Sequence, residues 1–334
     1  MPSLDPDIFA WLRQAGLADA DERPSMAALT GGVSSDVFLV DLRRGPVCVK
    51  RAIAQLRVSS DWRVPVARSD YEVAWLRTVR SLDGPIVPEV LAHDPEASRF
   101  AMTWFPPDRY SVWKSELACG HVSPEFAARV GSGLVAIHAR TAGSPEISAK
   151  FATDDLFDAL RIEPYLRYTA AVHTDLASRL EGIASEALAH KLVLVHGDVS
   201  PKNILVGPDG PVFLDAECAW FGDPAFDIAF CCTHLLLKAL WLPAYRSQLL
   251  GACEALRESY FAGVRWEAAS ALDARAGSLL AALLLARVDG KSPVEYLGGP
   301  EKAFARDAAR RFLSQTHLSL QGVGESWREQ LERS

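Results

Sequence analysis

The sequence predicts an α+β fold in which a small antiparallel-sheet lobe precedes a large helical lobe. The first third of the 334 residues alternates apolar and polar side chains in short runs, as antiparallel strands do. From Ser123 onward, helical spacing of apolar residues dominates to the C-terminus. The length exceeds that of one ordinary domain, so we expect two lobes, 1–105 and 106–334, joined near Pro106-Pro107.

The expected sheet begins with three alternating runs within residues 27–52. Turns are expected at Gly31-Gly32 and at Gly45-Pro46, because glycine and proline favour chain reversals. Two further strands are expected within 88–94 and 99–105. Between the third and fourth strands we expect one helix, because apolar residues recur at helical spacing at Val73, Leu76, Val79 and Leu82.

The helical lobe is expected to open at Ser123, which is followed by Pro124 in the first helical position. One segment of this lobe, 192–215, departs from helical spacing. Its second half, NILVGPDGPVFLD, is typical of a hairpin whose tip is Pro208-Asp209-Gly210. We therefore expect two short strands inside an otherwise helical lobe.

The composition of the sequence argues against a nucleic-acid-binding protein, a membrane protein and a disulfide-linked secreted protein. The net charge is −7 and the sequence holds no dense Lys/Arg run, so we expect no nucleic-acid partner. No run approaches about 18 uninterrupted apolar residues, so no membrane partner is expected. The N-terminal segment is not typical of a secretory signal, and the six cysteines show no C-x-x-C spacing. Free thiols in the cytoplasm are the expectation; the sequence predicts no oligomeric state.

Three polar residues are expected to converge around the hairpin. Asp198 and Asn203 lie in the loop VHGDVSPKNILV between two apolar runs, and Asp215 ends the second strand of the hairpin. Folding the hairpin would bring Asp215 back beside the loop. Carboxylate and amide oxygens suit Mg²⁺, and a carboxylate that stays off the metal could accept a proton from a hydroxyl. A turn-stabilising role is the alternative for Asp198.

The motifs HGDVSPKN, FLDAE and FGDPAFDIA resemble the aminoglycoside phosphotransferase and choline kinase family, whose fold is similar to that of protein kinases. The resemblance covers roughly residues 28–290. It implies a two-lobed, ATP-dependent kinase in which Asp198 is the catalytic base, and Asn203 and Asp215 hold the Mg²⁺ of the nucleotide. It does not fix the acceptor.

Three further residues of these motifs are expected to support local structure. His196 is expected to brace the loop rather than to act as a base. Asp223 precedes Pro224 at a helix start, where an acidic side chain caps the first turn. Asp227 is expected to accept backbone hydrogen bonds from the catalytic loop.

The nucleotide phosphates are expected at the TGGVSS turn, through Gly31, Gly32, Ser34 and Ser35, although an ordinary hairpin turn explains this segment equally well. Lys50 lies in an apolar strand, where an unpaired ammonium group would be costly to bury. The family pattern pairs Lys50 with Glu72 and directs it at the phosphates. A surface position is the alternative for Glu72.

The strand FAMTWF resembles the one that leads into the hinge of kinases. The resemblance places Met102 behind the nucleotide base. It also implies that the Thr103 carbonyl group and the Phe105 N–H group bond the purine edge. An ordinary core role is the alternative for these residues.

The acceptor site is predicted less directly. Seven acids within 151–190 would suit a cationic aminoglycoside or choline, or would simply form a solvated helix face. His234 and Lys238 share one helix face, and Arg287 and Asp289 lie at a helix break. These groups could bind a carboxylate or polyol hydroxyls, or act locally at helix ends. We expect a small hydroxylated metabolite, with an aminoglycoside antibiotic as the alternative.

Lys202 is a further candidate catalytic residue. Ser200 stands where many protein kinases place a lysine, and Lys202 is the closest cation in the loop. We expect Lys202 to stabilise the transferring γ-phosphoryl group, the alternative being a solvent-facing lysine. A regulatory pseudokinase is the competing function. Pseudokinases usually lose the lysine, the base or a metal ligand, and this sequence retains all three.

Overall fold

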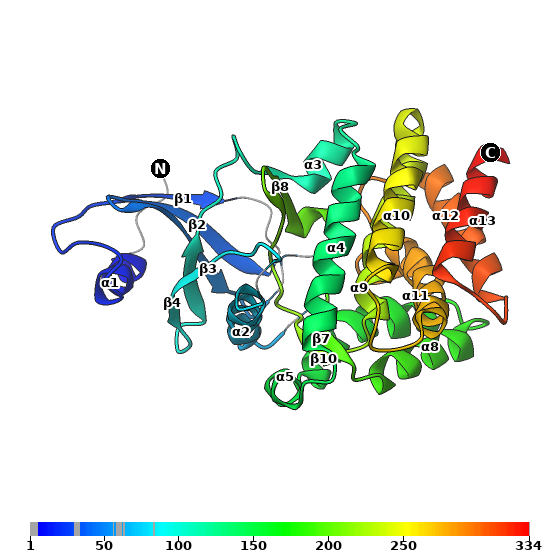
Figure 1. The fold of residues 1–334 in the computed structure, drawn as a ribbon, viewed down its shortest axis with the longest axis horizontal. Helices are drawn as coiled ribbons and strands as arrows, with labels where there is room; N and C mark the ends of the chain where they lie inside the picture. The colour runs from blue at the N-terminus through cyan, green and yellow to red at the C-terminus, as the bar shows by residue number, and fades with distance from the viewer. Residues whose placement is uncertain are drawn as a thin grey trace.

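The structure, a computed structural model, describes residues 6–29, 34–55, 57, 62, 64–82 and 84–333. It contains the predicted small antiparallel sheet followed by a large helical part (Figure 1). The sheet has the order β1-β2-β3-β5-β4, and all neighbouring strands are antiparallel. Its strands are β1 (Ser25–Leu29), β2 (Ser35–Leu42), β3 (Gly45–Ala52), β4 (Val90–Asp94) and β5 (Arg99–Thr103).

The two faces of this sheet are covered by different helices. Helix α1 (Pro6–Gln14) packs Trp11 and Leu12 into a cluster with Val49 of β3. Helix α2 (Arg68–Arg80) packs against β3, β4 and β5, and is the helix expected from its apolar spacing. Successive side chains of a strand point to opposite faces. Lys50, next to Val49, is therefore directed to the α2 side.

The helical part is built around the apolar helix α9 (Ala225–Trp241), which is buried along almost its whole length. Helix α4 (Pro124–Thr141) begins at the predicted position, and the Ser123 hydroxyl accepts a hydrogen bond from the Phe126 N–H group at 3.0 Å. Helices α10 and α11 pack on α9, and α12 and α13 lie at the far end (Figure 1). Their bounds are α10 (Arg246–Phe261), α11 (Ala269–Asp289), α12 (Gly299–Leu313) and α13 (Leu320–Arg333).

Shorter helices fill the segment between the sheet lobe and α9. Pro164 lies inside the π-helix η1, where the proline lacks an N–H donor for the helical ladder. The helices are α3 (Trp113–Ala118), α5 (Pro145–Lys150), α6 (Asp154–Phe157), η1 (Asp158–Arg167), α7 (Tyr168–Val172) and α8 (Ala177–Ala189). Two 3₁₀ turns, Pro201–Asn203 and Pro243–Tyr245, complete the set among the described residues.

Two small sheets position the loop that carries Asp198. The predicted hairpin is present, with Pro208-Asp209 at its tip and the pair Gly207 and Gly210 closing it. A short pairing of β7 with β10 was not expected, because β10 has only three residues and all are buried, so no alternation marks it. The strands are β6 (Ser111–Val112), β7 (Val193–Val195), β8 (Ile204–Gly207), β9 (Gly210–Phe213) and β10 (Trp220–Gly222).

Helix α11 is long and apolar enough, by length and composition alone, to cross a membrane. However, 72% of its apolar window is buried inside the protein. Helices α9, α12 and α13 pack on it. Its hydropathy therefore reflects a place in the core of the helical part.

All six cysteines are free thiols, as predicted. Five are buried and Cys119 is exposed. Burial raises the pKa of the Cys48 thiol to about 12, so this thiol stays protonated and unreactive at neutral pH.

Candidate active site

Asp227 of helix α9 anchors the loop between β7 and β8 through hydrogen bonds to its backbone. The Asp227 carboxylate, which is fully buried, accepts hydrogen bonds from the backbone N–H groups of His196 and Gly197, both at 2.8 Å. Gly197 has φ +77°, and a Cβ there would lie 2.6 Å from the Cys218 carbonyl oxygen. A side chain at this position is therefore excluded by both conformation and space. The predicted supporting contact of Asp227 is confirmed.

His196 braces the same loop, as expected. Its Nδ1 accepts the Asp198 N–H group at 3.1 Å, so its Nε2 carries the proton and donates to the Leu214 carbonyl oxygen at 3.0 Å. Burial lowers the pKa of His196, more than the nearby carboxylates raise it, which keeps the ring neutral. The ring also meets Trp75 of α2 edge-on, with centroids 4.9 Å apart. His196 therefore ties the loop both to the hairpin and to the sheet lobe.

The Asp198 carboxylate is surrounded by donors. The Asn203 amide nitrogen donates to its Oδ2 at 2.9 Å, and the same oxygen lies 3.0 Å from Arg161 Nη2 and 3.1 Å from Lys202 Nζ. Burial raises the pKa of Asp198, but Lys202 and Arg161 outweigh it and the net shift is downward. Asp198 is therefore an ionised, oriented carboxylate in a cleft, as a hydrogen-bond acceptor for a hydroxyl requires.

Arg161, which sequence reasoning missed, comes from the π-helix η1. Its Nε donates to the Gly197 carbonyl oxygen, and its Nη1 to the Leu160 carbonyl oxygen at 2.7 Å. π-Helical turns are frequent at functional sites. The sequence did offer a signal, because Arg161 lies between the apolar residues Leu160 and Ile162 and is therefore expected to be buried. A buried guanidinium group needs an anionic partner, and this would have pointed to a nearby carboxylate.

A second ion-pair cluster joins the sheet lobe to the hairpin. Lys50 Nζ lies 2.7 Å from Glu72 Oε2, as predicted, and also donates to Asp215 Oδ1. Burial would lower the pKa of Lys50, but Asp215 and Glu72 together raise it above its ordinary value. Burial raises the pKa of Asp215, yet Lys50 and Lys202 hold it well below its usual range. Burial raises the pKa of Glu72 to about 7, more than Lys50 lowers it. Lys50 and Asp215 are therefore held as an ion pair beside the loop that carries Asp198.

A third buried ion pair, Arg68 with Glu217, also escaped sequence reasoning. Arg68 Nε donates to Glu217 Oε2 at 2.9 Å, and Nη2 donates to the carbonyl oxygens of Ile53 and Ser34. The partners are 149 residues apart, so no local pattern marks them. This arginine fixes the backbone at Ser34, which faces the site.

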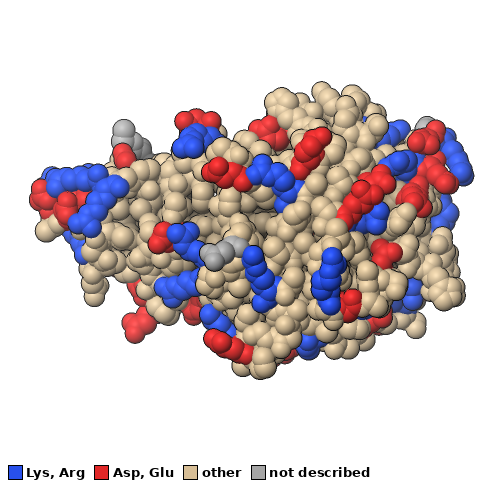
Figure 2. Space-filling model, in the orientation of Figure 1, with Lys and Arg blue, Asp and Glu red and all other residues tan. Residues whose placement is uncertain are grey.

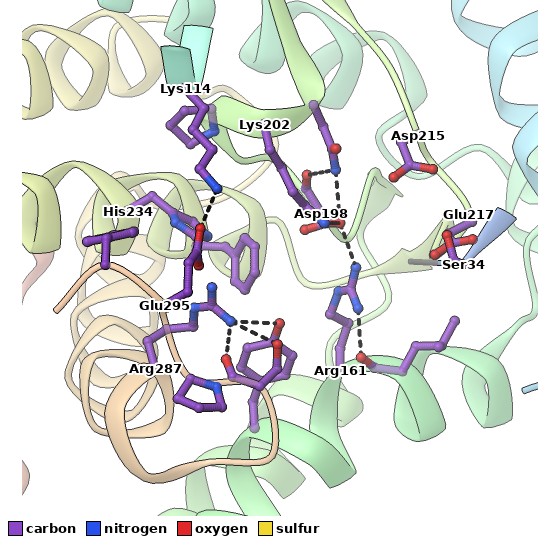
Figure 3. Close-up of a pocket in the computed structure, with 18 of the residues that line it drawn as sticks. Ser34, Lys114, Arg161, Asp198, Lys202, Asp215, Glu217, His234, Arg287 and Glu295 are labelled. Carbon is purple, nitrogen blue, oxygen red and sulfur yellow. Dashed lines mark hydrogen bonds and ion pairs between the residues drawn. The ribbon is translucent and has the colours of Figure 1, made fainter. Parts of the chain in front are cut away.

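Two cavities meet at the loop that carries Asp198, between β7 and β8. The first, of about 600 Å³, is lined by residues of the sheet and of the segment after β5. The second, of about 400 Å³, is lined by Asp198, Arg161 and residues of α9, α11 and the chain after α11. Both are of the size of small-molecule sites. They share the residues Ser34, Lys202, Asn203 and Asp215. Figure 3 shows the second cavity, with Ser34, Lys202 and Asp215 among its labelled lining residues.

Most of the predicted binding residues line one of these cavities. The first cavity contains, of the residues expected at the nucleotide, Ser34, Ser35, Lys50, Glu72, Met102, Thr103 and Phe105. Gly31 and Gly32 lie outside the described residues. The second cavity contains His234, Lys238 and Arg287 of the residues expected at the acceptor.

Asp289, the fourth residue expected at the acceptor, does not line the second cavity. Its carboxylate pairs with Arg306, at 2.6 Å for both contacts, and with His173 Nε2 at 2.9 Å, away from the cavity. Two residues along an α-helix differ by about 200° in direction. Asp289 therefore faces the opposite side of α11 from Arg287.

The acids of segment 151–190 do not form a wall of the second cavity. None of the seven lines it. Several pair with surface cations instead, such as Asp158 with Arg167 and Asp175 with Arg310. These acids therefore belong to a solvated helix surface with local ion pairs, which was the alternative to an acidic binding wall. Positive and negative side chains are also intermixed over the face drawn in Figure 2.

Asn203 and Asp215 could hold part of the coordination sphere of a metal ion. Asn203 uses its amide nitrogen toward Asp198, which leaves its oxygen available, and Asp215 adds a carboxylate at the same junction. Within the described ranges, no three His, Cys, Asp or Glu side chains are grouped so as to hold a metal. This donor set fits Mg²⁺, which is commonly bound by one or two protein oxygens together with phosphates and water.

The anchoring of the loop by Asp227 gives a first prediction. Asp227→Asn replaces one acceptor oxygen with an NH₂ group that faces a backbone N–H, so we expect unfolding free energy to fall by about 2–3 kcal/mol. Urea denaturation followed by circular dichroism measures this. Asp209→Asn, at the exposed hairpin tip, is the matched control and should change stability little. Equal stability of Asp227→Asn and wild type would contradict the anchoring role.

Comparisons with known proteins place these features in a family. The phosphotransferase enzyme family matches residues 25–262. Methylthioribose kinase from Escherichia coli O45:K1 is 25% identical over 240 residues, which are 63% of this chain and 56% of that protein. The chain spans about half to three fifths of the length of the curated relatives it matches.

Solved structures share the fold. A choline/ethanolamine kinase family protein from Mesorhizobium loti superimposes with a TM-score of 0.53 at 17% identity, covering 98% of this chain and 100% of that one. Amicoumacin kinase hAmiN, in complex with AMP-PNP, Ca²⁺ and Ami, gives a TM-score of 0.54 at 14% identity, covering 94% and 97%. Because the family match extends over most of its length, this chain belongs to the phosphotransferase enzyme family.

Proposed function

We propose that the protein is an ATP-dependent phosphotransferase that moves the γ-phosphoryl group to a hydroxyl of a small molecule. The observation that carries this proposal is the junction of two cavities at Lys202, Asn203 and Asp215, beside Asp198. A donor and an acceptor that occupy adjoining cavities meet where the cavities join. Holding two reactants in this way supplies much of the rate enhancement of phosphoryl transfer.

The larger cavity is the proposed nucleotide site, with the two lobes dividing between 105 and 106. Its lining is mainly apolar near Met102, where a purine would pack, and backbone groups of Thr103 and Phe105 would bond the purine edge. Lys50, oriented by Glu72, would contact the phosphates. The AMP-PNP complex of hAmiN, which has the same fold, supports a nucleoside triphosphate as donor.

At the junction, Asn203 and Asp215 would hold the Mg²⁺ of the nucleotide. Bound there, the metal ion would neutralise charge on the phosphates. Asp215 also contacts Lys50, so the same carboxylate would orient both groups that face the phosphates.

Asp198 is the proposed base and orienting group for the acceptor hydroxyl. Its position in the smaller cavity, and its ionised state beside Arg161 and Lys202, support this role. Lys202 lines both cavities, and its side chain remains 48% exposed. It could therefore leave Asp198 for the transferring phosphoryl group, where an ammonium group stabilises negative charge.

The retained Lys50, Asp198 and Asp215 disfavour the pseudokinase alternative. Three curated relatives are named methylthioribose kinases, which favours a sugar-sized polyol as the acceptor skeleton. An aminoglycoside is disfavoured, because Lys238 and Arg287 line the smaller cavity without an ion-pair partner among the described residues and would repel its ammonium groups.

A pair of variants tests the roles at the junction. Asp198→Asn should lower acceptor-dependent ADP release by about 10²- to 10⁴-fold while leaving Mg-nucleotide affinity intact, because Asp198 faces the acceptor. Asp215→Asn should weaken the magnesium-dependent part of AMP-PNP binding, because a protein ligand to the metal loses its charge. Coupled-enzyme assays and isothermal titration measure the two effects. Full turnover by Asp198→Asn, or undiminished magnesium dependence in Asp215→Asn, would overturn the assignment.

Lys202 can be tested separately. Lys202→Met should lower kcat roughly 10-fold or more with KM for ATP little changed, the mark of an interaction made mainly in the transition state. Steady-state kinetics measures both constants. Lys191→Met, which removes a lysine outside both cavities, is the control. If Lys202→Met has the same kcat as the wild type, Lys202 is a solvent-facing lysine without a role in phosphoryl transfer.

A further inference from the structure

The smaller cavity has two ends of different chemistry. Asp198 and Asp215 lie at one end, where the two cavities meet, and His234 and Arg287 lie across the cavity from them (Figure 3). The catalytic end presents carboxylates. The opposite end, formed by α9, α11 and the chain after α11, presents the cations Lys238 and Arg287, together with Glu295, whose carboxylate is paired with Lys114.

Lys238 of α9 is buried without an anionic partner. The residue is 1% exposed, and its Nζ makes no hydrogen bond within the described part of the chain. The ammonium group lies over the rings of Tyr296 and Trp241, 4.5 Å and 5.3 Å from their centroids. Aromatic faces attract a cation but do not replace a counter-ion. Burial of an unpaired charge is costly, so a buried ammonium group that lines a cavity indicates an anionic ligand.

Arg287 of α11 is in a similar state. Its Nη1 donates to the Ser292 hydroxyl at 3.1 Å and to the Ser292 carbonyl oxygen, whereas its buried Nε has no partner among the described residues. No carboxylate of the described chain forms an ion pair with it. The guanidinium group is therefore oriented by neutral acceptors and keeps its full charge toward the cavity.

The other charges that line this cavity are already paired. Asp198 is paired with Arg161 and Lys202, and Lys114 with Glu295. The two remaining acids are also engaged: Asp215 with Lys50, and Glu217 with Arg68. Among the described lining residues, Lys238 and Arg287 are the cations that form no ion pair; the Glu295 carboxylate acts on both electrostatically but is paired with Lys114.

We infer that the acceptor carries an anionic oxygen group, a carboxylate or a phosphate, which binds Lys238 and Arg287 while the reacting hydroxyl lies at Asp198. The inference rests on the proposed function, since it names the acceptor class of the same site. The cavity of about 400 Å³ accepts a small polyhydroxylated acid or a sugar phosphate. His234 lines the same cavity. Burial, Arg287 and Lys238 lower the pKa of His234, so its ring is neutral and can form hydrogen bonds with the ligand.

The charge of Lys238 is sensitive to pH near neutrality. Burial lowers its pKa to about 8, assisted by Lys114 and Arg287 and opposed by Glu295. His234 and Tyr296 are the other titratable groups of the cavity that face it. The ammonium form binds an anion and is present below this pKa, so anion preference should decline as pH rises through about 8.

A matched acceptor series tests the inference. D-Glucitol, D-gluconate, D-glucitol 6-phosphate and D-glucamine share one polyol skeleton and differ in the charge of a terminal group. Isothermal titration of the full chain with each compound, at pH 7 and pH 9, measures affinity without requiring turnover. We expect one or both anions to bind at least about 10-fold more tightly than D-glucitol at pH 7, with less preference at pH 9, and D-glucamine to bind more weakly. The two anionic arms distinguish a carboxylate from a phosphate.

Variants link the preference to the named cations. Lys238→Met should lower the preference for the anion over D-glucitol several-fold, since only Arg287 then remains to bind it, whereas Lys302→Met, outside the cavity on α12, should retain the full preference. Removal of an unpaired buried charge should not lower stability, so thermal melting separates lost binding from misfolding. Binding of D-glucitol or D-glucamine that equals or exceeds that of both anions would overturn the inference, and so would an undiminished anion preference in Lys238→Met. A failure of the proposed function would give a different result, because AMP-PNP and Mg²⁺ would then not bind in the larger cavity.

Discussion

The arrangement of the site depends on the ammonium group of Lys50. This group, on β3 of the sheet lobe, contacts both Glu72 of α2 and Asp215 after β9, so one buried cation joins three segments. Each carboxylate alone would be costly to bury, and together they raise the pKa of Lys50 and keep it charged. Because Asp215 belongs to the hairpin that follows the catalytic loop, this contact sets the position of the larger cavity relative to Asp198.

The catalytic loop depends on a second, independent support. Asp227 accepts the N–H groups of His196 and Gly197, and His196 connects the loop to Leu214 of the hairpin and to Trp75 of α2. These hydrogen bonds orient the backbone before any ligand binds. In the proposed function, Asp198 would therefore need little rearrangement to receive an acceptor, which is how preorganised sites reduce the cost of positioning.

Sequence patterns predicted the parts of the molecule whose information is local. The strands of the first lobe, the start of α4 at Ser123 and the hairpin near Asp209 follow from alternation, capping and turn residues over a few positions. Arg161 and the Arg68–Glu217 pair were missed, because their partners are distant in sequence and no spacing rule links them. That Asp289 pairs with Arg306 instead of lining the second cavity could not be predicted for a similar reason: a helix break marks an exposed segment but not which of its residues face a cavity.

In the proposed function, phosphoryl transfer takes place where the two cavities meet. A crystal structure of the protein with AMP-PNP and Mg²⁺ would locate both ligands. We expect the adenine base beside Met102, the metal ion on the oxygens of Asn203 and Asp215, and the γ-phosphoryl group facing Asp198 across the shared edge. A nucleotide bound outside the larger cavity, or a metal ion that contacts neither Asn203 nor Asp215, would overturn this assignment.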